Sequence, residues 1–197
     1  MERLLLGTRN KGKITEIRGL LSDLSGLELL TFEDIPFSEV EETGETFLDN
    51  ALLKAGSIVR ETGLPVLAED AGLEVFALSG EPGVRSARYA GEGHDYAANN
   101  ALLLKRLQGV EDRRARFITV AVLLLPDRRV FVTTGTLPGT IAHAPAGEGG
   151  FGYDPLFIPS GASKTLAQLS LDEKNRISHR MRAMRRMKPI IRDLVEG

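Results

Sequence analysis

The stretch RLLLGTRNKGKITEIRGLLSDLSGLELLT, residues 3–31, decides the fold expected of this 197-residue chain. Its first residues, 3–7, are a short apolar run that ends in glycine, which predicts a buried strand. Apolar residues then recur at helical spacing, at Ile14, Ile17, Leu20, Leu21 and Leu24. Residues 27–31 return to a strand pattern. Strand, loop, helix and strand in this order predict a βαβ unit with two parallel strands and a right-handed crossover.

The rest of the chain adds helices and further strands to this unit. Helices are expected after the capping residues Thr46, Asp95 and Ser170, and the first of them closes at Gly63 and Pro65. Strand patterns lie at residues 66–68, 117–125, 130–136 and 140–142, with a hairpin turn at Pro126-Asp127. The middle strands are too long and too antiparallel for a doubly wound fold. We therefore predict an α/β protein with a mixed central sheet and flanking helices.

Composition narrows the class of protein. The length suits one domain or two small lobes that share a core, and 42% hydrophobic with 26% charged residues is typical of a globular chain. The absence of cysteine excludes a disulfide framework and a thiolate metal site. The longest apolar runs, such as 120–125, are too short to span a membrane, and the start Met-Glu-Arg does not resemble a secretory signal. We expect a cytoplasmic protein that does not bind membranes.

Charge is unevenly distributed along the chain. The net charge of −2 argues against a general nucleic-acid coat protein. No Lys or Arg occurs between Gly19 and Leu53, where nine acids lie, whereas residues 174–192 hold eight Lys or Arg and no acid. A solvated helix face is the ordinary explanation of such runs. The alternative is a site that joins an acidic metal-binding loop to a basic anion-binding helix.

The first candidate site is the loop Thr8-Arg9-Asn10-Lys11-Gly12-Lys13, between the first strand and the first helix. Backbone N–H groups at the start of a helix suit a phosphate, and three cations add positive charge there. The spacing of a Walker loop is missing, because Ile14 follows Lys13. A plain basic turn is the other interpretation, although cations at a helix start oppose the helix dipole.

The second candidate is Glu69-Asp70, which we place at the end of the buried strand 66–68. Carboxylates at that end of a strand suit a metal ion or a general base. Glu41 or Glu42 of the acidic stretch is expected to supply a second oxygen ligand to Mg²⁺, which takes one or two carboxylates together with phosphate oxygens. A simple turn built on Asp70 and Gly72 is the alternative.

The third candidate is the glycine-rich segment 147–155, in which Phe151 or Tyr153 offers a stacking face for a flat base. A surface loop with a structural Phe is the alternative. Ser178-His179-Arg180, taken alone, indicates only a solvated helix face. The other histidines, His94 and His143, have no partner spacing and are expected at the surface.

Seven motifs, spread in order over essentially the whole chain, resemble the inosine triphosphate pyrophosphatase family, also called the Ham1/RdgB family. They are Thr8-x-Asn10-x-x-Lys13, Glu42-Thr43-Gly44, Phe47-x-x-Asn50-Ala51-x-x-Lys54-Ala55, Glu69-Asp70-x-Gly72-Leu73, Pro82-Gly83-Val84-x-Ser86-Ala87-Arg88-Tyr89, Gly149 to Pro155, and Ser178-His179-Arg180. The segment Glu69-Asp70-Ala71-Gly72 departs from the family pattern, which is often Asp-Asp-Ser-Gly. Ala71 has no hydroxyl, so a substrate contact there must come from its backbone.

The resemblance implies one pyrophosphatase domain over residues 1–197, with two lobes around a nucleotide cleft. It implies Mg²⁺-dependent hydrolysis of ITP, dITP and XTP between the α and β phosphates, in a homodimer that binds no nucleic acid. Asp70 would be the catalytic base, and Glu42 would hold the metal with Asp70, Glu41 being the fallback. The substrate-binding residues would be Thr8, Arg9, Asn10, Lys11, Gly12, Lys13, Lys54, Ala71, Phe151, Gly152, Tyr153, Asp154, Lys174, His179 and Arg180.

Base choice would follow from hydrogen-bond polarity. Hypoxanthine and xanthine carry an acceptor oxygen at C6, whereas adenine carries an amino donor, so donors from His179 and Arg180 would favour the former. Three alternatives remain: a Maf-like pyrophosphatase for pyrimidine or modified nucleotides, a regulatory nucleotide-binding module, and nucleic-acid binding by the basic C-terminal helix. The acids Glu42, Glu69 and Asp70 argue against a module that only binds phosphate.

Overall fold

A computed structural model describes residues 1–93 and 95–197, so His94 lies outside the described residues, and His143 is exposed as predicted. In this part of the chain, a six-stranded sheet has the order β2-β1-β3-β4-β5-β6. The strands are β1 Arg3–Leu6, β2 Glu28–Leu30, β3 Val66–Val75, β4 Arg114–Leu124, β5 Val130–Ile141 and β6 Phe157–Pro159. The helices are α1 Lys11–Leu21, α2 Phe47–Thr62, α3 Tyr96–Arg106, α4 Leu171–Ile177 and α5 His179–Glu196.

The predicted βαβ unit and the mixed sheet are confirmed. β1 pairs in parallel with β2, Arg3 opposite Glu28, and with β3, Leu5 opposite Val66. At the other edge β5 and β6 are antiparallel. The turn around Pro126-Asp127 joins β4 to β5, and the Leu125 N–H donates to the Arg129 carbonyl across it. Residues 140–142 do not form a separate strand as predicted, because β5 continues without a break to Ile141.

β3 is longer than predicted, and this moves the acids. The strand was expected to end at Ala68, but it runs to Val75, so Glu69 and Asp70 lie within it. The turn interpretation of Asp70 and Gly72 is therefore wrong. β1 ends at Leu6, opposite Leu67, so the two acids lie where β3 passes the carboxyl end of its parallel neighbour. The residues after Asp70 stay extended because Leu73 and Val75 are fully buried in a core of their own.

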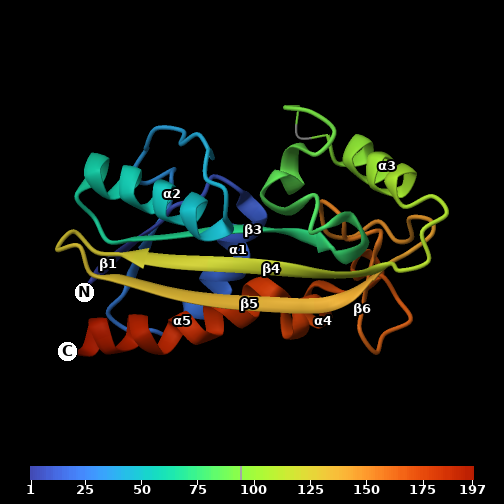
Figure 1. Ribbon diagram of the computed structural model, residues 1–197. Helices are drawn as coiled ribbons and strands as arrows, with labels where there is room; N and C mark the ends of the chain where they lie inside the picture. The colour runs from blue at the N-terminus through green and yellow to red at the C-terminus, as the bar shows by residue number, and fades with distance from the viewer. Residues whose placement is uncertain (94) are drawn as a thin grey trace. The chain divides into compact units, whose positions relative to one another are not determined.

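The chain divides into two compact units, and β3, β4 and β5 each contribute to both. Unit 1 comprises residues 1–70, 119–135 and 180–197, and unit 2 comprises residues 71–118 and 136–179. In unit 1, strand alternation sends Leu4 and Leu6 toward α1 and α5, and Leu5 toward α2. Figure 1 shows α2 and α5 on opposite faces of these strands. Unit 1 is thus a sheet with a helical layer on each side.

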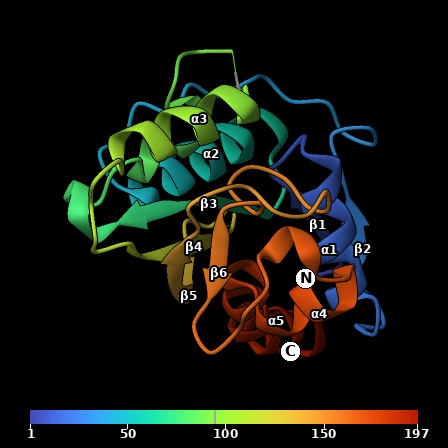
Figure 2. The ribbon, with the colours of Figure 1, turned by 90° about the vertical axis from the view of Figure 1, so that its right-hand side faces the viewer.

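Unit 2 has its own core around Phe157, which is fully buried and packs at a tilt against Phe117, with the ring centres 4.6 Å apart. Leu103 of α3 packs into this core, and Figure 2 shows α3 over the strands. The basic C-terminal region is two helices, because Ser178 is extended (ψ 148°) and ends α4 before α5 begins. No described helix is long and apolar enough to cross a membrane.

Candidate functional site

The turn between β1 and α1 is shorter than predicted. The Asn10 side chain accepts a hydrogen bond from the Lys13 N–H at 3.1 Å and so caps α1. The helix therefore begins at Lys11, and the residues from Lys11 to Lys13 form its first turn instead of a loop. Thr8 supports the turn by accepting the Asn10 N–H at 3.2 Å. The first turn of α1 carries no acid, so its N–H groups and positive dipole end suit an anion.

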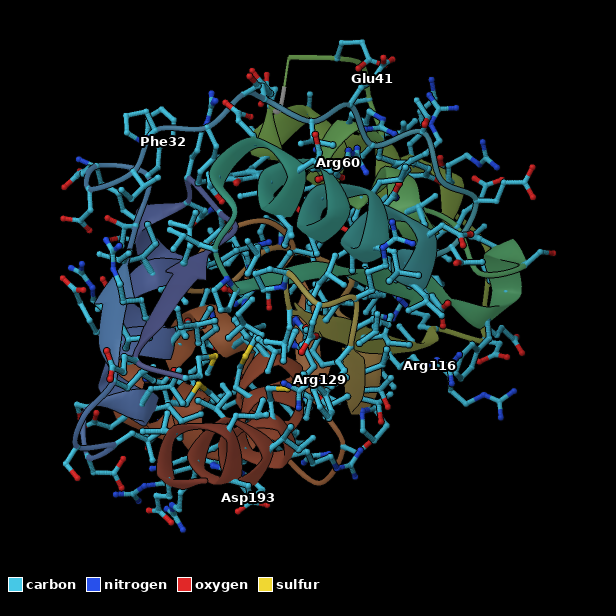
Figure 3. The ribbon with its side chains drawn as sticks, turned by 90° about the vertical axis from the view of Figure 1, so that its left-hand side faces the viewer. Phe32, Glu41, Arg60, Arg116, Arg129 and Asp193 are labelled. Atoms are coloured by element: carbon cyan, nitrogen blue, oxygen red, sulfur yellow. The ribbon has the colours of Figure 1, made fainter. Side chains whose placement is uncertain are left out.

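Arg9 binds protein groups in the acidic loop, which we define as residues 31–46 between β2 and α2. Its Nη2 donates to the Phe37 carbonyl at 2.5 Å, and its guanidinium lies 4.3 Å from the ring centre of Phe32. Glu39 adds an ion pair at 3.8 Å. Phe32 lies on the outside of unit 1 in Figure 3. Arg9 thus ties the turn before α1 to the acidic loop.

Lys13 is one end of a buried chain of alternating charges. Its Nζ lies 3.0 Å from Oε1 of Glu69. Nε of Arg180 donates to both oxygens of Glu69, at 2.8 and 3.1 Å, and Nη1 donates to Glu16 at 2.9 Å. Burial opposes ionisation of Glu69, but the charges of Arg180 and Lys13 outweigh it and hold the pKa of Glu69 far below its usual value. This series of ion pairs has no net charge, because Glu69 and Glu16 balance Lys13 and Arg180.

The interpretation of Ser178-His179-Arg180 as a solvated helix face is wrong. His179 is 6% exposed and Arg180 is 3% exposed. The His179 ring stacks on Phe117 at 4.7 Å in unit 2, whereas Arg180 belongs to unit 1. Glu16 was not among the predicted site residues, because it lies at the edge of the apolar stripe of α1 and no motif marks it.

Lys54 joins the acidic loop to β3. From α2, its Nζ lies 2.9 Å from Oε1 of Glu42 and 3.3 Å from Oδ1 of Asp70. Glu41 is instead exposed and lies at the edge of the molecule in Figure 3. Of the two predicted metal ligands in the loop, Glu42 is therefore the one that shares a partner with Asp70.

Asp70 is buried and lies in a charged setting. Burial raises its pKa, an effect that the charge of Lys54 partly offsets. Its Oδ2 accepts a hydrogen bond from Nδ2 of Asn50 at 3.2 Å. Asn50 was not predicted as a site residue, although an asparagine beside Phe47 and Ala51 on an apolar helix face is a signal that the sequence did offer.

These groups of unit 1 surround a small cleft of about 170 Å³, lined by Thr8, Arg9, Lys13, Glu42, Lys54 and Glu69 among others. The carboxylates of Glu42 and Asp70 lie close enough for one ammonium group to bind both. Such a pair of oxygen donors fits Mg²⁺, which completes its shell with water and phosphate oxygens. Among the described residues, no three His, Cys, Asp or Glu converge on one point, so protein groups alone do not form a closed metal cage.

The glycine-rich segment of unit 2 is built around Asp154. This buried carboxylate accepts hydrogen bonds from the Phe151 N–H at 2.8 Å and from Nζ of Lys174 at 2.7 Å. A Cβ on Gly150 would lie 2.0 Å from Oδ2 of Asp154, so only glycine fits there. The ammonium of Lys174 also lies 4.7 Å from the ring centre of Phe151. The structure thus brings three of the predicted residues together in one cluster, namely Phe151, Asp154 and Lys174.

Tyr153 is a core residue and does not offer a stacking face. It is 3% exposed, and its hydroxyl donates to the Ser86 carbonyl at 2.9 Å. Of the two predicted aromatic groups, only Phe151 is partly exposed. Gly152 has a positive φ of 64°, and its carbonyl accepts a hydrogen bond from Asn100 of α3. Ala71, half-buried in β3, offers only its backbone and methyl group.

The fold is an α/β architecture built on a mixed sheet. In unit 1, a strand–turn–helix segment that suits an anion lies beside paired carboxylates and lysines. Together these features define a class of α/β protein suited to a phosphorylated ligand and a metal ion. The chain belongs to the Ham1 family, whose model matches residues 4–190. A dITP/XTP pyrophosphatase of Streptomyces coelicolor is 49% identical over 200 residues, which cover 99% of this chain and 100% of the relative. One of Thermus thermophilus is 48% identical over 193 residues, covering 97% and 92%.

Solved structures agree with this assignment. The Ham1 protein of Staphylococcus aureus matches with a TM-score of 0.89 and 41% identity, over 98% of this chain and 99% of the other. A HAM1 protein of Coxiella burnetii matches with a TM-score of 0.91 and 36% identity, over 98% and 100%. The α/β architecture predicted from the sequence is therefore that of solved members of the family.

Proposed function

We propose that this chain is a nucleoside-triphosphate pyrophosphatase that hydrolyses dITP, ITP and XTP to the monophosphate and pyrophosphate. In this way it would keep deaminated purines out of DNA and RNA. Full-length relatives named dITP/XTP pyrophosphatase support the reaction. The observation that carries the proposal is the cleft of unit 1, which Lys13, Lys54, Glu42 and Glu69 line and where Lys54 also binds Asp70. Lysines attract a triphosphate, and the carboxylates of Glu42 and Asp70 add the oxygen groups that a metal ion and a water molecule would require.

The phosphate end of the substrate is assigned to the turn before α1 and to the two partly buried lysines, Lys13 and Lys54. The N–H groups of Thr8 and Asn10 already donate within the turn, to the Leu6 carbonyl and to Thr8 Oγ1. The backbone N–H groups of Arg9, Lys11 and Gly12, with the Thr8 hydroxyl and the Asn10 side-chain amide, would bind phosphate oxygens at the helix start. Lys13 and Lys54 keep their ammonium groups in place through Glu69 and Asp70. Arg9 was predicted to bind phosphate. Its contacts with Phe37 and Glu39 instead favour a role in holding the acidic loop.

Hydrolysis requires water to attack the α-phosphorus while the bond to the β-phosphate oxygen breaks. Asp70, whose carboxylate is held by Asn50 and Lys54, would orient the water and accept its proton. The negative charge that develops on the departing pyrophosphate would be neutralised by Lys13 and Lys54. Mg²⁺, held by Glu42 and Asp70 when bound, would supply further charge neutralisation on the phosphate oxygens.

The base end is assigned to Phe151 and its cluster. Phe151 would stack on the purine, with Gly152, Asp154 and Lys174 shaping the loop. His179 and Arg180 stay proposed as donors to the C6 oxygen, on the basis of the family resemblance. Nε and Nη1 of Arg180 donate to Glu69 and Glu16, so these two groups are engaged within unit 1.

A nucleotide panel tests the proposal. Pyrophosphate release is measured from ITP, XTP, ATP, dTTP and UTP, with and without Mg²⁺. We expect Mg²⁺-dependent release from ITP and XTP that far exceeds release from the other three. Preference for dTTP or UTP would favour the Maf-like alternative, and tight binding of ITP without turnover would favour the regulatory module.

Two further properties are proposed from the family resemblance alone. We propose that the protein forms a homodimer and that it works in the cytoplasm without binding nucleic acid. Light scattering coupled to size-exclusion chromatography measures the first. Titration with plain duplex DNA at several salt concentrations measures the last, because phosphate-driven binding weakens steeply as salt rises.

A further inference from the structure

We propose that Asn50 is a positioning residue that fixes the Asp70 carboxylate and the acidic loop in one arrangement. The proposal rests on the function proposed above, in which Asp70 activates water and Glu42 holds the metal ion. Asn50 itself is fully buried at the start of α2. It is not among the residues that line the cleft, so the role we assign to it acts through its two partners, Gly44 and Asp70.

Both ends of the Asn50 side chain are in use. Its Oδ1 accepts a hydrogen bond from the backbone N–H of Gly44 at 2.7 Å, and its Nδ2 donates to Oδ2 of Asp70 at 3.2 Å. The opposite orientation of the amide would set donor against donor and oxygen against carboxylate. The partners therefore fix which way the amide faces, and the amide in turn links the loop to β3.

The loop side of this link requires a close approach of two backbones. A Cβ on Gly44 would lie 2.6 Å from Cβ of Asp49 and 2.7 Å from Oδ1 of Asn50. Only glycine therefore allows the N–H at position 44 to reach the amide. Because Gly44 follows Glu42 by two residues, the link also restricts where the Glu42 carboxylate can lie.

The strand side of the link fixes the rotation of the Asp70 carboxylate. Oδ2 takes the hydrogen bond from Asn50, which leaves Oδ1 facing Lys54 at 3.3 Å. A carboxylate that orients a water molecule must itself be held to within a fraction of an ångström. Aspartate at position 50 would keep the contact with Gly44 but place a second carboxylate against Asp70, so the amide chemistry is specific to Asn.

The chain offers a matched control in Asn99. This asparagine of α3 is 2% exposed, accepts the Ala90 N–H at 2.7 Å and donates to the Ala87 carbonyl at 3.0 Å. Like Asn50 it is buried, helical and bonded at both ends of its amide, but its partners are backbone groups of unit 2. Asn99→Asp therefore repeats the chemical change without a carboxylate partner.

The kinetic experiment compares Asn50→Asp, Asn50→Ala and Asn99→Asp with the unaltered protein, using ITP and saturating Mg²⁺. We expect both Asn50 variants to lose about tenfold to a hundredfold in kcat, with KM changed by less than about threefold. Asn99→Asp should melt at a lower temperature and keep its kcat per folded molecule. A kcat for Asn50→Asp within about twofold of the unaltered protein, or an equal loss in Asn99→Asp, would overturn the proposal.

Two readouts do not depend on turnover. A protease that cleaves after glutamate reports on the acidic loop through Glu39, Glu41, Glu42 and Glu45. We expect faster cleavage there in Asn50→Ala, which loses the Gly44 contact, and unchanged cleavage in Asn50→Asp, which keeps it. Equal cleavage in all variants would refute the link to the loop.

The second readout is a double-mutant cycle of melting temperatures. Asn50→Asp combined with Asp70→Asn exchanges the two side chains and restores a donor–acceptor pair, so the double variant should be more stable than the sum of the single changes predicts. Strict additivity would refute the contact with Asp70. If the unaltered protein fails to hydrolyse ITP, the proposed function falls, while this cycle still decides whether the contact exists.

Discussion

At the scale of single residues, Asp70 is the group on which turnover is expected to depend most. Asp70→Asn is nearly isosteric but removes the charge that faces Lys54 and that would hold Mg²⁺. We expect kcat for ITP to fall by far more than tenfold, each tenfold step being about 1.4 kcal/mol of barrier, while circular dichroism shows an intact fold. A variant that keeps more than about a tenth of its kcat would remove Asp70 as the essential base.

Arg180 is a second residue whose role one substitution can decide. Arg180→Ala removes the guanidinium that Glu69 and Glu16 share, and both carboxylates stay buried without it. We therefore expect the free energy of unfolding to fall by about 3–5 kcal/mol. Among the molecules that stay folded, a donor to the C6 oxygen would lower kcat/KM for ITP more than for ATP. A phosphate contact would lower both by the same factor, because both carry the same triphosphate.

At the scale of elements, the glycine-rich segment allows a prediction with an internal control. Gly150 and Gly152 both have positive φ, 76° and 64°, so alanine strains the backbone at either position. Only at Gly150 would the new Cβ meet Asp154, whereas nothing lies within 4 Å at Gly152. We expect Gly152→Ala to cost about 1–2 kcal/mol and Gly150→Ala clearly more, because it also displaces Asp154 from Lys174. Urea denaturation of the two variants measures the difference, and equal losses would contradict it.

Elements were predictable where their signals are local. Thr46 and Ser170 start helices through capping boxes that the sequence shows within four residues. The length of β3 was not predictable, because adjacent acids indicate a turn unless distant partners neutralise them. Glu69 stays in the strand through Arg180, which lies 111 residues further along the chain. No periodicity or spacing rule records such a contact, and the family motifs placed both residues in the site without showing that they pair.

The structure brings some of the predicted site residues into contact, and the sequence did not show these contacts for the same reason. The sequence singled out Lys13 as a phosphate-binding residue, Glu69 as an acid and Arg180 as a hydrogen-bond donor to the purine base. The structure joins these three residues in one buried series of ion pairs. Asp154 and Lys174 were likewise named and found paired. Arg9 and Tyr153 were placed by charge and aromaticity alone, and their partners, Phe37 and Ser86, are backbone carbonyls that no sequence pattern specifies.

At the scale of the whole molecule, the buried chain of charges makes stability depend on pH. The folded pKa of Glu69 lies well below its unfolded value of about 4.3, although burial alone would raise it, because Arg180 and Lys13 favour the ionised form. As pH falls, Glu69 therefore takes up its proton in the unfolded chain before it does so in the folded protein. The stability that Glu69 contributes is fully present above its unfolded pKa and is lost as pH falls below it. Asp70 acts in the opposite direction, since its pKa is raised in the folded state.

Measurement of the free energy of unfolding between pH 7 and pH 3 tests this, with Glu69→Gln as the comparison. We expect the unaltered protein to lose stability more steeply than the variant below about pH 5, where unfolded glutamate takes up its proton. Exposed carboxylates with lowered pKa, such as Asp112 beside Arg114, also add to acid sensitivity, but salt screens them. Repeating the series in about 0.5 M salt should therefore reduce the surface contribution and leave the difference between the two proteins, because the pair of Glu69 and Arg180 is shielded from ions. Parallel curves at both salt concentrations would show that the buried chain does not set the acid limit of the fold.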